Sequence, residues 1–262
     1  MRRILAGIVL ALLLTGGAAA GPLEDGYAAY QRGDYSTALQ LWQPLAEQGD
    51  ANAQCNLGFM YGKGEGVPQD HAEAAKWFRL AAEQGYVTAQ HNLGIMYVVG
   101  QGVPQDYAEA IKWFRPAAEQ GDANAQYDLG IMYGRGQGVP QDDAEAVKWY
   151  RLAAEQGLEI AQLILGTMYA KGQGVPQDYA EAVKWYRLAA EQGQANAQLS
   201  LGTMYANGQG VPQDYVQAHM WVNLAATKGY DAAIEARKRI AAKMTPAQIA
   251  EAQKLAREWK PK

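Results

Sequence analysis

Residues 123–157 read ANAQYDLGIMYGRGQGVPQDDAEAVKWYRLAAEQG, and this stretch decides the fold. In its first half, Ala125, Leu129 and Met132 recur at the spacing that places apolar side chains on one face of a helix. Gly136 follows this pattern directly, and glycine ends helices because it adopts positive φ without steric cost. The first half therefore predicts one amphipathic helix that ends in a glycine turn.

The second half of the stretch predicts another helix with a defined start. Pro140 cannot continue the first helix, and Asp142 stands where an N-cap would be. Glu145 follows three residues later, which is the spacing of a capping box. Trp149 lies on the inward face of this second helix. The Asp residues are thus predicted to be caps and not catalytic acids.

The two-helix unit recurs with a period of 36 residues. The string GVPQD occurs five times with this spacing, with its valine at Val67, Val103, Val139, Val175 and Val211. A fixed period of this length is typical of a solenoid, in which each unit packs mainly against its neighbours. The sequence therefore predicts an all-α solenoid of stacked helix-turn-helix repeats, with an extended surface and no enclosed pocket.

The pattern A-Q-x-x-L-G-x-M-Y, then GxGVPQD, then A-x-x-W-Y-x-x-A-A-E-Q-G closely resembles the Sel-1-like repeat family, which is related to tetratricopeptide repeats. The resemblance covers about two-thirds of the chain. It implies a right-handed α/α superhelix that acts as an adaptor for protein complexes, often at or beyond the bacterial inner membrane. One secreted, cysteine-rich branch of the family is connected with β-lactam binding or hydrolysis, but its paired cysteines are missing from this sequence.

The repeat spacing divides the chain into consecutive units. We expect a signal peptide, a shorter unit of tetratricopeptide type, five full repeats and a C-terminal helical cap: 1–20, 21–49, 50–85, 86–121, 122–157, 158–193, 194–229 and 230–262. The last repeat has Met220 and Val222 where earlier repeats have charged or polar residues. This change predicts that the C-terminal segment covers its second helix, since a solenoid needs a cap at its end.

The N-terminus indicates export. Arg2 and Arg3 precede an apolar run, and small residues end the segment, which is the order of a signal peptide cleaved after Ala20. The run is too short to span a membrane, and no later stretch is long enough. We therefore expect a periplasmic or secreted protein that does not span the membrane.

The composition excludes several function classes. Without Arg2 and Arg3, 21 basic residues face 27 acidic ones, so a nucleic-acid partner is not expected. Cys55 is the only cysteine, and the three histidines have no partners at metal-ligand spacing. No nucleophile–base pair is visible. The sequence therefore predicts no metal site, no cofactor and no enzymatic activity.

Two positions of the first helix differ between repeats, while the residues that pack repeat on repeat barely change. Four residues apart, these positions share one helix face, which lines the concave surface in tetratricopeptide arrays. We expect a partner-binding groove formed by the following side chains: Phe59, His91, Ile95, Tyr127, Ile131, Leu163 and Thr167. The alternative is that these side chains only pack inside a tightly wound superhelix.

The leading functional hypothesis is an exported, non-enzymatic scaffold that binds a protein or peptide partner in the cell envelope through this groove. A cell-envelope hydrolase, or a protein that binds β-lactams or peptidoglycan, is the alternative from another class. A glycan-binding module is a third possibility.

Overall fold

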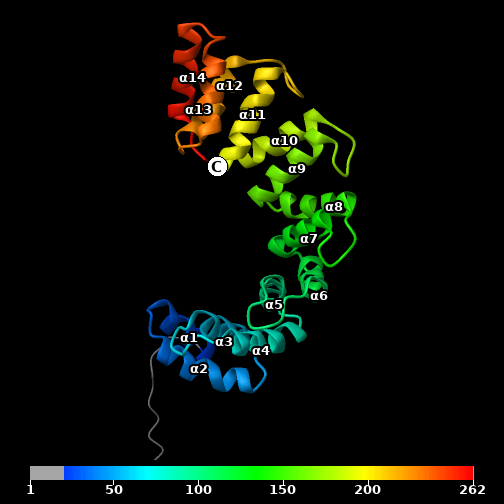
Figure 1. Ribbon diagram of the computed structural model, residues 1–262. Helices are drawn as coiled ribbons and strands as arrows, with labels where there is room; N and C mark the ends of the chain where they lie inside the picture. The colour runs from blue at the N-terminus through cyan, green and yellow to red at the C-terminus, as the bar shows by residue number, and fades with distance from the viewer. Residues whose placement is uncertain (1–20, 262) are drawn as a thin grey trace, which may run out of the picture.

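Helices are the only regular secondary structure in the described part of the chain, residues 21–261 of a computed structural model. The expected signal peptide lies outside these residues. Successive helices pair and stack into an open arc (Figure 1). Their bounds are α1 Pro22–Gln31, α2 Tyr35–Glu47, α3 Ala51–Lys63, α4 His71–Glu83, α5 Val87–Val99, α6 Tyr107–Glu119, α7 Ala123–Arg135, α8 Asp143–Glu155, α9 Glu159–Lys171, α10 Tyr179–Glu191, α11 Ala195–Asn207, α12 Tyr215–Ala226, α13 Asp231–Ala241 and α14 Pro246–Glu258. The predicted all-α solenoid of stacked helix pairs is confirmed.

Each odd-numbered helix from α3 to α11 ends on a glycine, as expected. Gly136 caps α7 with φ of 64°, a left-handed conformation that favours glycine. Gly138 follows with φ of 74°, and a Cβ built there would lie 2.5 Å from the backbone of Tyr107. The long loop therefore packs directly against the preceding repeat, which only glycine permits at that point.

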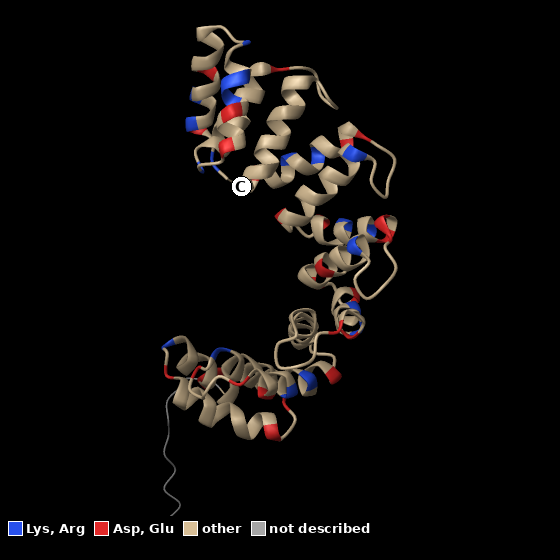
Figure 2. Ribbon diagram, in the orientation of Figure 1, with Lys and Arg blue, Asp and Glu red and all other residues tan. Residues whose placement is uncertain are grey.

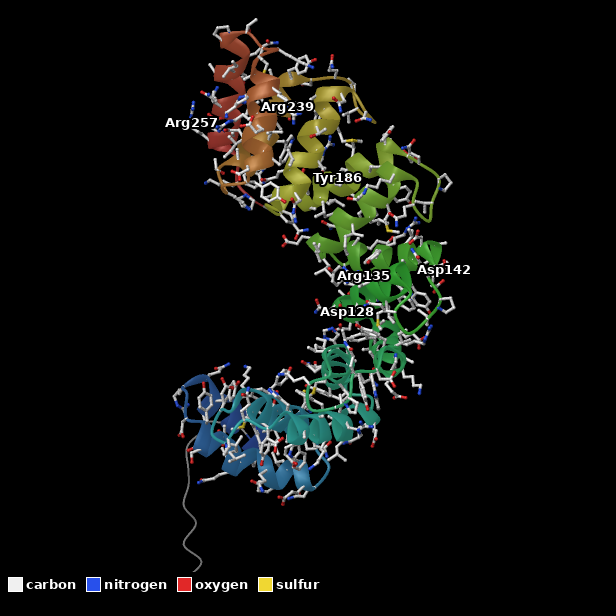
Figure 3. The ribbon with its side chains drawn as sticks, in the orientation of Figure 1. Asp128, Arg135, Asp142, Tyr186, Arg239 and Arg257 are labelled. Carbon is white, nitrogen blue, oxygen red and sulfur yellow. The ribbon has the colours of Figure 1, made fainter. Side chains whose placement is uncertain are left out.

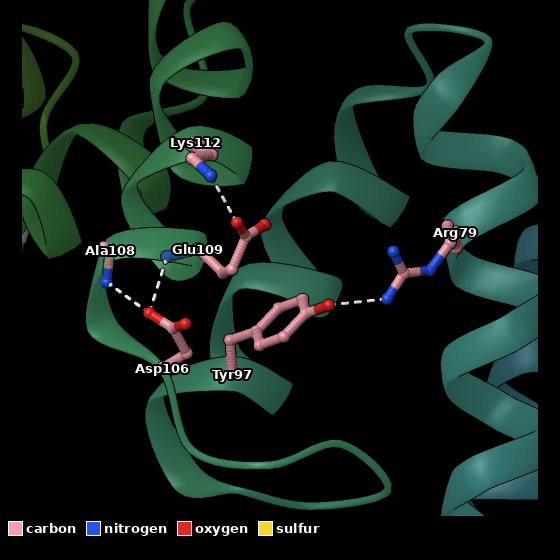
Figure 4. A network of polar contacts seen from close by, with 6 residues as sticks. All are labelled: Arg79, Tyr97, Asp106, Ala108, Glu109 and Lys112. Atoms are coloured by element: carbon pink, nitrogen blue, oxygen red, sulfur yellow. Dashed lines mark hydrogen bonds and ion pairs between the residues drawn. The ribbon is translucent and has the colours of Figure 1, made fainter.

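The even-numbered helices from α2 to α12 begin at aspartate caps, but the second half of the capping box predicted for the repeats is wrong. The Asp106 carboxylate accepts hydrogen bonds from the backbone N–H groups of Ala108 and Glu109. The Glu109 carboxylate, however, pairs with Lys112 (Figure 4). It has no role at the cap because the Asp106 backbone N–H already donates to the Tyr97 carbonyl at 2.9 Å.

A ladder of buried glutamines joins the repeats. Gln90 Nε2 donates to the Ala82 carbonyl at 3.2 Å, and Gln90 Oε1 accepts from Gln120 Nε2 at 3.0 Å. The same arrangement recurs at Gln54, Gln126 and Gln162. Each buried amide thus joins its repeat to the preceding one through Nε2 and is satisfied within its own repeat through Oε1, as buried polar groups require.

The C-terminal helices α13 and α14 pack on α12. Met220 and Val222 are buried, and the ring of Trp259 meets that of Trp221 edge-on at 6.2 Å. Arg237 Nη1 donates to the Asn223 side chain at 2.8 Å. The apolar residues of the last repeat are therefore covered by the segment that follows it.

Candidate functional site

The side chains expected to bind a partner lie on the odd-numbered helices α3, α5, α7 and α9. These helices face the inside of the arc around its middle (Figure 1). We call their inward face the concave strip, defined by Phe59, His91, Ile95, Tyr127, Ile131, Leu163 and Thr167. Ile95 is 38% exposed, and the others are half-buried. The strip is therefore partly accessible along its length.

Pockets open along the strip where neighbouring odd-numbered helices meet. The pocket between α7 and α9 has a volume of about 400 Å³, and Ile131, Leu163 and Thr167 line it. The pocket between α5 and α7, also about 400 Å³, is lined by Ile95 and by Ile131 again. Ile131 thus belongs to both pockets. Apolar pockets in a row suit the side chains of a bound segment.

A third pocket lies at the N-terminal end of the strip. It has a volume of about 390 Å³ and is lined by Phe59, Tyr27 and Lys63, among others. Phe59 packs edge-on against Phe78 with ring centroids 5.1 Å apart, which fixes this wall of the pocket.

Two residues of the strip serve mainly in packing. His91 Nε2 lies 2.8 Å from Asp128 Oδ2 of the next repeat, and its ring lies 5.6 Å from that of Phe114. Tyr127 packs on Tyr150 at 6.0 Å, and burial raises the pKa of the Tyr127 hydroxyl. An open groove and internal packing, the two alternatives drawn from the sequence, therefore each describe part of the strip. Ile95, Ile131, Leu163 and Thr167 line open pockets, whereas His91 and Tyr127 pack against neighbouring residues.

Sequence reasoning missed Asp128 and Arg135. Arg135 lines both central pockets, and Asp128 lines one of them and binds His91 (Figure 3). A signal was present, because these positions also differ between repeats. Arg135 corresponds to Lys63, Val99, Lys171 and Asn207, and Asp128 corresponds to Asn56, Asn92, Ile164 and Ser200.

The groups near the strip that could react are the Cys55 thiol and the His91 imidazole. Burial raises the pKa of the Cys55 thiol to about 12, so it is not a thiolate nucleophile near neutral pH. No hydroxyl or thiol of residues 21–261 is hydrogen-bonded to His91. Within that range, no group of three or more His, Cys, Asp or Glu side chains could hold a metal ion. The site offers apolar pockets, a few hydrogen-bonding groups and a guanidinium.

The family model for the Sel1 repeat matches residues 21–50, 51–86, 87–122, 123–158, 160–194 and 195–230. The chain belongs to the Sel1 repeat family. The match at 21–50 shows that the shorter first unit is itself a Sel1 repeat. Arrays of this family generally mediate protein–protein interaction.

Solved structures of Sel1 repeat proteins share the architecture. A protective antigen of uropathogenic Escherichia coli with an SLR fold has 40% sequence identity and a TM-score of 0.82; the similarity covers 90% of this chain and 53% of that one. The present chain thus spans about half the length of that antigen. A Sel1 repeat protein from Oxalobacter formigenes has 33% identity and a TM-score of 0.76 over 90% of this chain and 97% of that one. Among curated proteins no match was found.

None of the helices in the described range combines the length and apolar character needed to cross a membrane.

Proposed function

We propose that this chain is an exported, non-enzymatic scaffold that binds a protein partner in the cell envelope through the concave strip of its Sel1 repeats. The observation that carries the proposal is the row of open pockets on the inside of the arc. They lie where helices of neighbouring repeats meet, and Ile131 lines two of them. A bound segment could place successive side chains in them, as peptides do in the grooves of helical proteins.

The electrostatics of the strip support a binding role over a catalytic one. The helices α5 and α11 carry no charged residue, and their ribbons are tan throughout (Figure 2). By contrast, the outer helix α8 carries Lys148 paired with Glu145. Inner helices with so few charged residues favour contact with a protein surface. Export is supported by the leader-like residues 1–20 and is compatible with a relative that is a protective antigen.

The test is site-specific crosslinking in the envelope fraction. A photoreactive amino acid at Thr167, in the pocket between α7 and α9, is expected to trap a discrete protein. The matched control carries it at Lys184, an exposed residue of the outer helix α10. Equal capture from both positions would contradict binding through the strip. Failure to recover the chain from the envelope fraction would contradict export.

A further inference from the structure

The concave strip continues beyond the last Sel1 repeat onto α13. Thr203 and Asn207 occupy on α11 the positions of Ile131 and Arg135 on α7. They line a pocket of about 250 Å³ together with Arg239, on α13, and Lys243. The helix α13 therefore lies beside α11 in the way that α9 lies beside α7, although the family match ends at residue 230.

The edge of the strip where the odd-numbered helices end is basic. The last strip position of each helix is occupied by Lys63, Val99, Arg135, Lys171, Asn207 and, beyond α13, Lys243. Lys63 pairs with Glu65. Arg135, Lys171, Arg239 and Lys243 form no ion pair with any residue between 21 and 261. Four cations are thus available along one edge. We call this set the basic edge.

Most acidic side chains near the strip are engaged or lie elsewhere. Asp143 lines the pocket between α7 and α9 and accepts a hydrogen bond from Gln173 Nε2 at 3.3 Å. Asp128 binds His91, and Glu235 pairs with Lys238 at 2.7 Å. Arg239 also acts on Glu235, since it helps to lower the pKa of that carboxyl, although less than Lys238 does. Glu159 and Asp231 are the first residues of α9 and α13, at the opposite edge. The positive charge left for a partner is therefore greatest at Arg239 and Lys243, because Asp128 and Asp143 share the central pockets with Arg135.

We propose that the segment recognised by the strip is an acidic peptide. Its apolar side chains enter the central pockets, and its carboxylates lie along the basic edge, where Arg239 and Lys243 hold one of them in the pocket between α11 and α13. This inference rests on the proposed function and adds the chemistry of the partner.

The geometry of the cations supports a carboxylate as their ligand. Arg239 and Lys243 line one pocket together and can approach a single carboxylate. Arg135 lines both central pockets, where it lies among apolar side chains and beside Asp143 in one pocket and Asp128 in the other. Guanidinium groups bind carboxylates with two parallel hydrogen bonds. Lys243 Nζ lies 5.6 Å from the centroid of the Tyr215 ring, a cation–π contact that positions it over the pocket.

A peptide fits the strip better than a polyanionic nucleic acid or glycan. The pockets beside Arg135 are lined by Ile95, Ile131 and Leu163. These apolar side chains make no favourable contact with a uniformly charged backbone. The chain as a whole has a net charge of −4, which repels long polyanions. An acidic segment with interspersed apolar residues uses both features of the strip.

The experiment measures binding of a fluorescent synthetic peptide that alternates leucine and glutamate, with matched peptides that carry glutamine or lysine instead of glutamate. The protein is the full chain, compared with the double variant Arg239→Glu/Lys243→Glu. The control is Lys254→Glu/Arg257→Glu on α14, which makes the same change of net charge on the far side of the cap from α11 (Figure 3). Circular dichroism establishes that both variants fold.

We expect the acidic peptide to bind most tightly, and its affinity to fall as salt is added. The strip variant should lose at least about tenfold in affinity, because like charges across an interface repel strongly. The control variant should bind like the unmodified chain. Equal binding of the three peptides, no binding of the acidic one, equal effects of the two variants, or tighter binding of a sulfated glycan would overturn the proposal. If crosslinking from Thr167 succeeds despite such a result, the scaffold function is supported and only the acidic character of the partner is refuted.

Discussion

The guanidinium of Arg79 on α4 donates a hydrogen bond of 2.5 Å to the Tyr97 hydroxyl on α5, and so ties one repeat to the next (Figure 4). The bond recurs at the three following junctions, as Arg115–Tyr133, Arg151–Tyr169 and Arg187–Tyr205. With the lysines paired to glutamates on the same helices, the repeated basic residues serve the array itself.

Replacement of Tyr97 by phenylalanine is expected to lower the free energy of unfolding by about 1–2 kcal/mol, because a charged donor loses its acceptor. Urea denaturation checks the value. Tyr230→Phe is the control, since the Tyr230 side chain is 40% exposed and makes no hydrogen bond within the described range. A loss as large in the control would show that the Arg79 bond contributes nothing specific.

A second prediction concerns two glycines of the same helix. A Cβ at Gly130 would lie 2.6 Å from the Tyr150 ring, whereas a Cβ at Gly134 would lie 3.6 Å from Ala146 Cβ. Gly130→Ala should therefore destabilise the chain by about 1–3 kcal/mol through overpacking. Gly134→Ala should stabilise it by up to about 1 kcal/mol, since alanine favours the helix. Thermal unfolding of both variants decides, and the same sign of shift in both would refute the packing argument.

Trp149 and Leu152 provide a test of the core of the third repeat. Trp149 is 9% exposed and Leu152, three residues on in the same helix, is 43% exposed. Trp149→Ala should lower the free energy of unfolding by about 3–5 kcal/mol, the usual range for a buried aromatic side chain. Leu152→Ala should change it by less than about 1 kcal/mol. Chemical denaturation of both variants measures the two losses of unfolding free energy. Similar losses would show that Trp149 is not a core residue of the repeat.

The stability of the C-terminal end should depend on pH through His219. Burial, assisted by Arg237, lowers the pKa of this imidazole below its ordinary 6.5. Below pH 6.5 the unfolded chain therefore binds a proton that the folded chain does not, and the free energy of unfolding falls as the pH is lowered. Above that pH the effect is absent. His219→Gln should flatten the pH dependence of the melting temperature, and an unchanged slope would mean that other groups cause it.

The sequence predicted the helix pairs, their glycine ends and their aspartate caps, because each rests on local backbone requirements that recur in every repeat. It failed at the capping box because the fate of the Asp106 backbone N–H depends on the loop that returns to Tyr97. That contact is not local in sequence, and only the folded loop reveals it.

The candidate binding surface was less predictable than the fold. The variable positions on the inner helices pointed to Ile131, Leu163 and Thr167, which do line pockets. The contribution of α13 was missed because Arg239 and Lys243 lie outside the repeat and share none of its letters. Their place in the strip follows from how the cap packs beside α11, and packing of this kind leaves no periodic signal.

The glutamine ladder makes the junctions between repeats interchangeable. Each unit presents a buried amide whose Nε2 donates to a carbonyl of the unit before it, so a whole unit can be inserted or deleted without leaving this bond unmatched. The ladder stops at Gln198, whose Oε1 is buried without a hydrogen-bond partner in residues 21–261. The partner of this oxygen would be a glutamine at position 228 of the same repeat, where Lys228 instead donates to the Gly193 carbonyl. The bond that joins one unit to the next is present at Gln198 as at the other junctions, so the number of units, and with it the length of the concave strip, can change without a new kind of contact between units.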